Sequence, residues 1–159
     1  MLINFYTTLL QYNNYNYIAL DSNEKPLGFI VAGYEIDAAI NLFIKRNILS
    51  LSFILLKNPK FLYQKLKILL RKNSNNGFVS KANLRLLAIG VKKDSEHKGI
   101  GTQLIQYFDN DLLQNGENKY GLSVKKNNTN AIKFYLKNNF KVEKEDKNSI
   151  YYIKEISAI

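Results

Sequence analysis

Apolar residues recur along this chain with the spacings of both strands and helices. Residues 17–21 and 26–36 carry strand-like apolar runs joined by a polar turn from Asp21 to Lys25, so we expect two antiparallel neighbours. The run "NLRLLAIGV" at 83–91 is almost continuously apolar, which is typical of a buried central strand. Residues 119–124 predict a further strand. The segments "FKVEKE" and "SIYYIKEI" alternate apolar and polar residues, which predicts a closing hairpin.

Helical spacing appears twice between these strands. The first helix is predicted to open at Gly99 and to end before Gly116, a residue suited to a helix C-terminus. Its apolar face comprises Ile100, Leu104, Ile105, Phe108 and Leu112. The second helix is predicted over 128–139, with Asn128 as its N-cap.

The N-terminal half carries further helical patterns. Residues 2–11 have helix-like spacing, and Asp37 is suited to open a helical region over 37–71 that Pro59 divides into two helices. Lysines lie between the leucines of the second of these helices. The pair is interpreted either as ordinary core packing, as a lid over a substrate, or as a basic surface that contacts membrane.

Strands that precede, alternate with and follow helices place the chain in the mixed α/β or α+β class around one sheet. With 159 residues, the simplest organisation is one domain over 1–159.

The amino-acid composition limits which kinds of partner and metal site are possible. The formal net charge of +10 suits nucleic acid, an anionic membrane surface or a polyanionic small molecule, but also suits a merely well-solvated surface. Without cysteine and with His97 as the one histidine, disulfides, thiolate metal sites and multi-histidine metal centres are excluded, so no metal is expected. We find no signal-peptide pattern and no apolar run of about 18 residues, so a cytoplasmic protein without a membrane span is expected.

The stretch "DSEHKGIGTQLI" follows the strand at 83–91 and carries the clearest chemistry. Unpaired N–H groups at a helix N-terminus attract anions, and Gly99 and Gly101 allow the backbone to approach a phosphate. The motif is no P-loop, because no Lys-Ser/Thr pair follows Gly101. It is no dinucleotide fingerprint either, because Leu104 stands where a third glycine belongs.

This stretch resembles the acetyl-CoA signature of the GNAT family of N-acetyltransferases, Gln/Arg-x-x-Gly-x-Gly/Ala. Lys98, Gly99, Ile100 and Gly101 fit the signature, while Glu96 stands where Gln or Arg is usual. Downstream, "NTNAIKFYLKNNF" is similar to the family's second motif, Asn-x-x-Ala-x-x-x-Tyr-x-x-x-Gly-Phe. Its matching residues are Asn128, Ala131, Tyr135 and Phe140, and Asn139 replaces the glycine in a position where Asn tolerates left-handed geometry.

The resemblance implies a fold and a cofactor site. Strands 83–91 and 119–124 should diverge at their carboxyl ends and leave room for the pantetheine arm. Gly90, inside the apolar strand, suggests a bulge or a close backbone approach. The implied acetyl-CoA contacts are Ile89, Gly90, Val91, His97, Lys98, Gly99, Ile100, Gly101, Thr102 and Asn128. Against the family, the N-terminus looks shortened and the helical pair at 37–71 looks additional.

The same resemblance implies an activity. Tyr135 is the candidate general acid for the leaving CoA thiolate, and Glu35 is the candidate base. Relatives often carry Glu near the position of Arg85. The predicted function is acetyl transfer to the primary amine of an amino sugar, metabolite or peptide. The alternatives are a catalytically weak CoA-binding relative and a basic surface module for nucleic acid or membrane, although no nucleic-acid motif is present. The expected partner is a small amine, with a homodimer as an option.

Overall fold

The computed structural model describes residues 15–34, 45–47 and 80–157. Contacts divide the chain into two compact units, residues 1–11 with 37–79 and residues 12–36 with 80–159. Only 45–47 are described in the first unit, so the fold reported below is that of the second. The predictions for Glu35, for the helices at 2–11 and 37–71, and for the shortened N-terminus lie outside the described residues.

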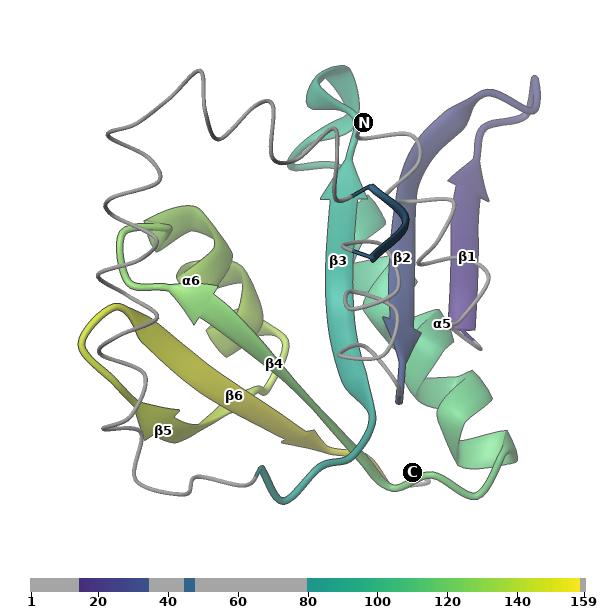
Figure 1. Cartoon of the computed structure of the whole chain (residues 1–159). Helices are drawn as coiled ribbons and strands as arrows, with labels where there is room; N and C mark the ends of the chain where they lie inside the picture. Colours follow the sequence, from purple (N-terminus) through teal and green to yellow (C-terminus); the bar gives the residue numbers. More distant parts are fainter. Residues whose placement is uncertain (1–14, 35–44, 48–79, 158–159) are drawn as a thin grey trace. The chain divides into compact units, whose positions relative to one another are not determined.

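The described part of the second unit contains six strands and two α-helices (Figure 1). In chain order they are β1 (Tyr15–Leu20), β2 (Pro26–Gly33), β3 (Arg85–Val91), the 3-10 turn η2 (Lys93–Ser95), α5 (Ile100–Gln114), β4 (Lys119–Lys125), α6 (Thr129–Lys137), β5 (Lys141–Glu145) and β6 (Ser149–Glu155).

The strands form one mixed sheet in the order β1-β2-β3-β4-β6-β5. Only β3 and β4 run parallel, and the other neighbours are antiparallel, so the predicted hairpins of β1 with β2 and of β5 with β6 are confirmed. The sequence predicts that the second strand runs to residue 36, but the strand ends at Gly33. Tyr34 leaves the ladder and its hydroxyl donates a hydrogen bond to Glu117.

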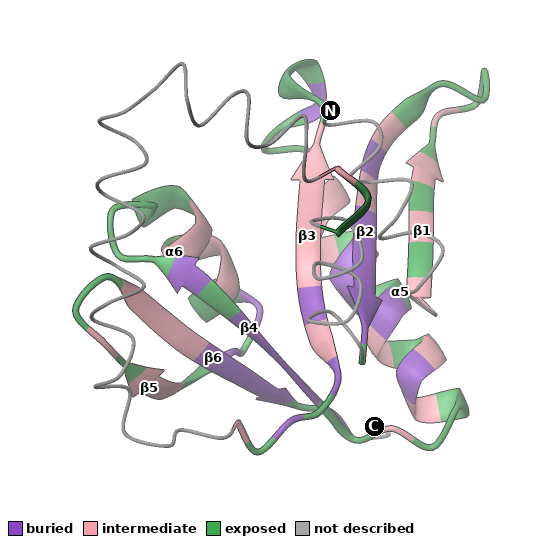
Figure 2. Cartoon of the chain, viewed as in Figure 1, coloured by how far each residue is buried: buried purple, intermediate pink, exposed green. Residues whose placement is uncertain are grey.

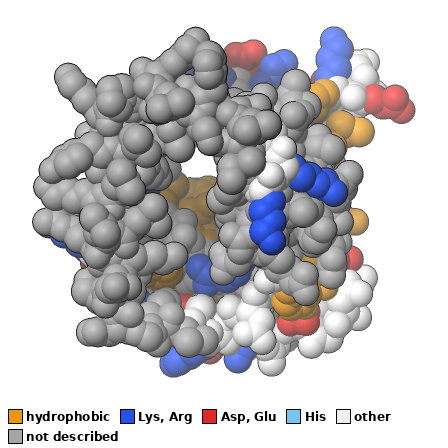
Figure 3. Space-filling model, in the orientation of Figure 1, with side chains coloured by type: hydrophobic (Ala, Val, Ile, Leu, Met, Phe, Trp, Pro, Cys, Tyr) orange, Lys and Arg blue, Asp and Glu red, His pale blue; other side chains and the backbone are white. Residues whose placement is uncertain are grey.

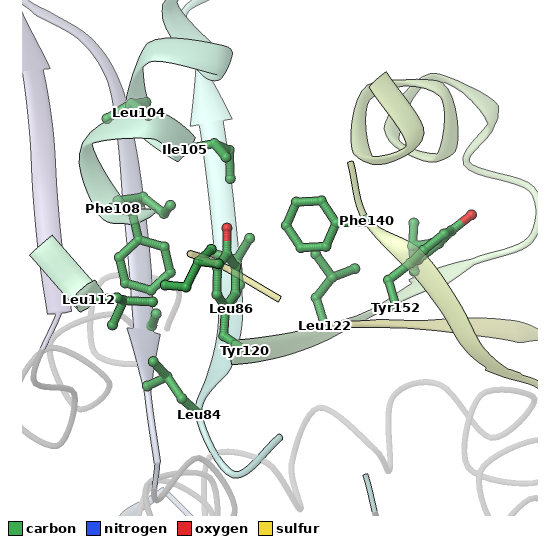
Figure 4. Close-up of a cluster of buried hydrophobic side chains, with 14 residues drawn as sticks. Leu84, Leu86, Leu104, Ile105, Phe108, Leu112, Tyr120, Leu122, Phe140 and Tyr152 are labelled. Carbon is green, nitrogen blue, oxygen red and sulfur yellow. The ribbon is translucent and has the colours of Figure 1, made fainter. Parts of the chain in front are cut away.

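The core lies where α5 packs on one face of the sheet. All four inward apolar positions predicted in the middle of α5 are buried, and Ile100 is partly buried. The ring of Phe108 meets that of Tyr120 edge-on with centroids 4.8 Å apart, and Tyr120 meets Phe140 at 5.4 Å. Figure 4 shows these rings between α5 and the strands, and Figure 2 shows buried positions on β2, β4, β6 and the inner side of α5.

Both helices end in the same way, with a left-handed residue that redirects the chain. Gly116 after α5 has φ 79° and Asn139 after α6 has φ 64°. The N–H of the following residue then reaches back to the last turn, from Glu117 to Leu112 O at 2.9 Å and from Phe140 to Tyr135 O at 3.1 Å. This is the Schellman pattern. The expectations for Gly116 and for Asn139 in left-handed geometry are confirmed.

Candidate active site

Strands β3 and β4 touch only where they begin. Arg85 and Gly121 are their one pair of register partners, and Gly121 N donates to Leu84 O at 2.9 Å. Beyond this point the two strands separate, as Figure 1 shows, so the predicted divergence of the central strands is confirmed. No described strand then pairs with the β4-facing edge of β3.

Successive residues of β3 direct their backbone N–H and C=O groups alternately toward β2 and toward the side of β4. Lys92 N donates to Leu27 O at 2.7 Å, and Gly90 lies opposite Phe29 in the same register. Antiparallel pairs alternate between bonded and non-bonded, so Gly90 directs its backbone groups toward β2. Ile89 and Val91 therefore direct their N–H and C=O groups into the gap beside β4.

The lack of a side chain at Gly90 leaves room for the ring of Phe29. A Cβ added there would lie 2.7 Å from Cε1 of Phe29, so the close approach expected at Gly90 is by an aromatic ring. The expected bulge falls elsewhere. Val31 is opposite Ala88 and Ala32 is opposite Leu86, which leaves Leu87 as the extra residue of β3.

The N-terminus of α5 lies directly after the carboxyl end of β3. Gly99 caps it with φ 84°, and the first helical hydrogen bond runs from Gln103 N to Gly99 O at 3.0 Å. The N–H groups of Ile100, Gly101 and Thr102 precede that bond and have no intrahelical acceptor. The helix dipole adds partial positive charge at the same place.

The loop before α5 presents its side chains to solvent. Glu96, His97, Lys98 and Gly99 are all exposed, and His97 adopts φ 62°. Lys98 places a cation next to the unpaired N–H groups. Glu96, which departs from the family signature, is exposed, so water screens its charge.

Gly101 in α5 lies where this helix comes close to α6 and β3. A Cβ at this position would lie 3.0 Å from Cε2 of Phe134 in α6 and 3.6 Å from Cγ2 of Val91 in β3. The sequence suggested only that a glycine here admits a phosphate. The structure adds a contact within the protein: the absence of a side chain lets α6 lie close to the start of α5. Phe134 could not be identified from sequence, because its spacing fits an ordinary helix face.

Tyr135 lies among aromatic rings on α6. Its ring centroid is 5.3 Å from Phe140 and 6.1 Å from Tyr152, and burial raises the pKa of its hydroxyl. No described residue forms a hydrogen bond with this hydroxyl. Asn128 accepts a hydrogen bond from Ala131 N at 3.2 Å, which confirms its predicted capping role.

Arg85 lies where β3 and β4 still pair, at the end of the gap between these strands. Its Nη1 donates to Ser80 Oγ at 3.0 Å, and Ser80 Oγ donates to Glu143 Oε2 at 2.8 Å. Desolvation by burial lowers the pKa of Arg85, although the guanidinium stays charged. Sequence reasoning missed Ser80 and Glu143, because only the sheet order brings β5 and the residues before β3 together.

The described residues show neither a metal-binding cluster nor a helix that could span a membrane. They contain no cluster of three or more His, Cys, Asp or Glu side chains placed to hold a metal ion. Every helix in this part of the chain falls short of the length and apolar character that a membrane crossing requires.

Comparisons with known proteins identify the family. The family model described as the acetyltransferase (GNAT) family matches residues 2–140. Among curated proteins, no sequence matches the chain significantly. The fold is similar to the ribosomal-protein-S18-alanine N-acetyltransferase from Escherichia coli, with a TM-score of 0.58 and 14% identity over 100% of this chain and 79% of that one.

Two structures similar to this one contain the cofactor. The PaiA N-acetyltransferase from Thermoplasma acidophilum, in complex with coenzyme A, has a TM-score of 0.58 and 18% identity over 97% of this chain and 69% of that one. A putative streptothricin acetyltransferase from Bacillus anthracis, in complex with acetyl coenzyme A, has a TM-score of 0.57 and 18% identity over 94% and 68%. At these identities the likeness concerns the fold. The family model spans most of the chain, so this protein belongs to the GNAT family and is an acetyl-CoA-dependent N-acetyltransferase.

Proposed function

We propose that the chain transfers the acetyl group of acetyl-CoA to the primary amine of a small acceptor, with the cofactor held between β3 and β4. One observation carries this placement. The gap-facing backbone groups of Ile89 and Val91 lead along β3 to the unpaired N–H groups at the start of α5. The amides of a pantetheine arm can form hydrogen bonds with the backbone groups of Ile89 and Val91. A pyrophosphate can bind the N–H groups at the start of α5.

The charges around the α5 N-terminus support the same placement. Lys98 is exposed beside the helix start, and Lys92 and Lys93 precede it in the loop. A pyrophosphate there would gain hydrogen bonds from Ile100, Gly101 and Thr102 together with a favourable local charge. His97, on the exposed turn, is a further candidate contact.

The transfer step needs few groups from the protein. The neutral amine nitrogen attacks the thioester carbonyl carbon, the C–N bond forms, and the C–S bond breaks to release CoA thiolate. In our proposal Tyr135 donates its proton to that sulfur, and a gap-facing N–H of β3 polarises the carbonyl oxygen. Glu35 remains the candidate from the sequence for removing the proton of the attacking amine.

A substitution on the gap-facing edge tests the placement. Val91→Pro removes one N–H that faces the gap and leaves the hydrogen bonds with β2 in place, because Val91 forms none there. Val91→Ala is the matched control, since it loses the side chain but keeps the N–H. We expect calorimetry to show at least tenfold weaker acetyl-CoA binding for Val91→Pro and a much smaller change for Val91→Ala.

The outcomes separate the alternatives. Equal acetyl-CoA affinity in folded Val91→Pro and wild type would place the cofactor elsewhere. Binding with no thiol release across a panel of amino sugars, polyamines and peptides would favour the catalytically weak relative. Salt-sensitive binding to nucleic acid or anionic vesicles, without acetyl-CoA binding, would favour the basic surface module.

A further inference from the structure

Arg85 occupies an unusual position in the sheet. It is the first residue of β3, and its register partners on both sides are glycines, Gly33 in β2 and Gly121 in β4. A Cβ on Gly121 would lie 3.2 Å from Cζ of Arg85 and still closer to Nη1, so the guanidinium lies directly over that glycine. Because Leu84 and Leu86 are buried in the core with α5, Arg85 points to the opposite face of the sheet.

That face is the one toward the viewer in Figures 1 and 3, since α5 passes behind β2 and β3. Figure 3, in the same orientation, draws the Lys and Arg side chains of the described residues in blue and the hydrophobic ones in orange. Arg85 therefore lies on the side of the sheet away from α5, at the point where β3 and β4 part.

Most of the hydrogen-bonding capacity of Arg85 is unused within the described part of the chain. Of the five N–H donors of a guanidinium, one reaches Ser80 Oγ at 3.0 Å. Ser80 Oγ also accepts from Ala82 N at 3.3 Å and donates to Glu143, so this hydroxyl has no capacity left. Glu143 in turn accepts from Lys81 N at 2.6 Å.

Ser80 thus separates Arg85 from Glu143. The two charged groups form no ion pair, and the network fixes one edge of the guanidinium while its other donors lack a described acceptor. Arg85 is also partly buried, where unsatisfied donors are costly. A fixed, partly desolvated guanidinium with free donors is suited to bind a planar anion in bidentate fashion.

We propose that Arg85 binds a carboxylate of the acceptor, so that the preferred substrates are amines that also carry an acid group. This inference rests on the proposed function. A carboxylate is favoured over a phosphate dianion because Glu143, one hydroxyl away, offsets part of the positive charge. With about 3.3 Å per strand residue, Arg85 and Ile89 are roughly 10–13 Å apart, which selects acceptors whose amine and carboxylate are separated by several bonds.

The test compares two probes that differ only in the charged group, 6-aminohexanoate and 6-aminohexanamide. The wild type should use the acid with at least tenfold higher kcat/KM than the amide. Arg85→Gln should remove this preference by lowering kcat/KM for the acid at least tenfold, with the amide within about twofold. Lys81→Gln, a neighbouring exposed lysine, is the matched control and should behave as wild type.

Binding measurements keep this test separate from the proposed function. Calorimetry on the CoA-bound protein should show tighter binding of the acid than of the amide in wild type but not in Arg85→Gln. Arg85→Lys keeps the positive charge but cannot bind a carboxylate in bidentate fashion, so it should lose most of the preference for the acid. This variant replaces Arg85→Gln if Arg85→Gln fails to fold. Acetyl-CoA affinity should be unchanged in every variant, and its absence in wild type would instead contradict the proposed function.

Three results would overturn the assignment of Arg85. Equal use or binding of the acid and the amide by the wild type is the first. A preference for the acid that survives in Arg85→Gln is the second. Tighter binding of 4-aminobutylphosphonate than of 6-aminohexanoate is the third, since it would assign the site to a phosphate-like group.

Discussion

Lys154 in β6 forms an ion pair with Asp109 in α5, with Nζ 2.6 Å from Oδ2 and side-chain exposures of only 10% and 16%. The other carboxylate oxygen accepts a hydrogen bond from the Tyr120 hydroxyl in β4 at 2.8 Å. Nζ of Lys154 also lies 5.4 Å from the ring centroid of Phe140. One carboxylate therefore connects α5 to both strands on the far side of the gap.

Removing that carboxylate should destabilise the fold strongly. Asp109→Leu leaves the Lys154 ammonium buried without its partner, so we expect a loss of about 3–5 kcal/mol in the free energy of unfolding, measured by urea denaturation. The double variant Asp109→Leu/Lys154→Met should recover most of this loss, because no buried charge remains.

An exposed ion pair serves as the control. Lys141 and Glu155 lie 3.5 Å apart with side-chain exposures of 75% and 68%, so Glu155→Gln should change stability by less than about 1 kcal/mol. A loss of the same size for Glu155→Gln and Asp109→Leu would contradict the role given to burial.

Two glycines that flank α5 allow the effect of a substitution on cofactor binding to be distinguished from its effect on stability. Gly99 and Gly116 have φ 84° and 79°, and an added Cβ would meet nothing within 4 Å at either position. Alanine at each should therefore cost a similar amount, about 1–2 kcal/mol, through backbone strain alone. Only Gly99→Ala, at the N-terminus of the helix, should weaken acetyl-CoA binding in calorimetry. Equal losses of affinity in both variants would argue against a phosphate site at this end of α5.

Asn139 offers a stabilising substitution. Its φ of 64° lies in the left-handed region, where glycine carries no Cβ penalty. We expect Asn139→Gly to leave stability unchanged or raise it slightly, and Asn139→Ala to lower it by about 1 kcal/mol. Thermal unfolding of the two variants measures this, and a more stable Asn139→Ala would contradict the conformational argument.

Local sequence signals predicted this part of the fold well. The left-handed Asn139, the cap at Asn128 and the apolar face of α5 each follow from a few neighbouring residues. These features depend on local backbone geometry, which short sequence patterns encode. The gap beside Ile89 and Val91 is not local, and it was predicted only through the resemblance of two motifs to a family.

Features that depend on distant pairings were not predictable. The bulge at Leu87 comes from the register between β2 and β3, and the contact of Phe134 with Gly101 comes from how α6 lies against α5. The network of Arg85, Ser80 and Glu143 needs β5 and the start of β3 to meet in the sheet. No spacing within a single segment carries that information.

Substitution of Tyr135 tests whether its hydroxyl is the general acid of the proposed reaction. Tyr135→Phe keeps the ring and its packing against Phe140 and Tyr152 but removes the proton. We expect unchanged acetyl-CoA affinity, with kcat and kcat/KM lowered together toward the lower end of the roughly 10²–10⁴-fold range typical of a lost general acid. Tyr152→Phe, a buried neighbour without a proposed role, is the control and should retain turnover.

The pH dependence gives an independent check of this role. Burial raises the pKa of the Tyr135 hydroxyl above its ordinary value of 10.0, so the acid stays protonated through neutral and mildly alkaline pH. Any loss of kcat caused by its deprotonation must therefore appear above pH 10, and Tyr135→Phe should lack that loss. An alkaline limb well below pH 10 that disappears in Tyr135→Phe would contradict the buried environment. Turnover equal to wild type in Tyr135→Phe, with chemistry shown to be rate-limiting, would mean that the leaving sulfur takes its proton from water or another donor.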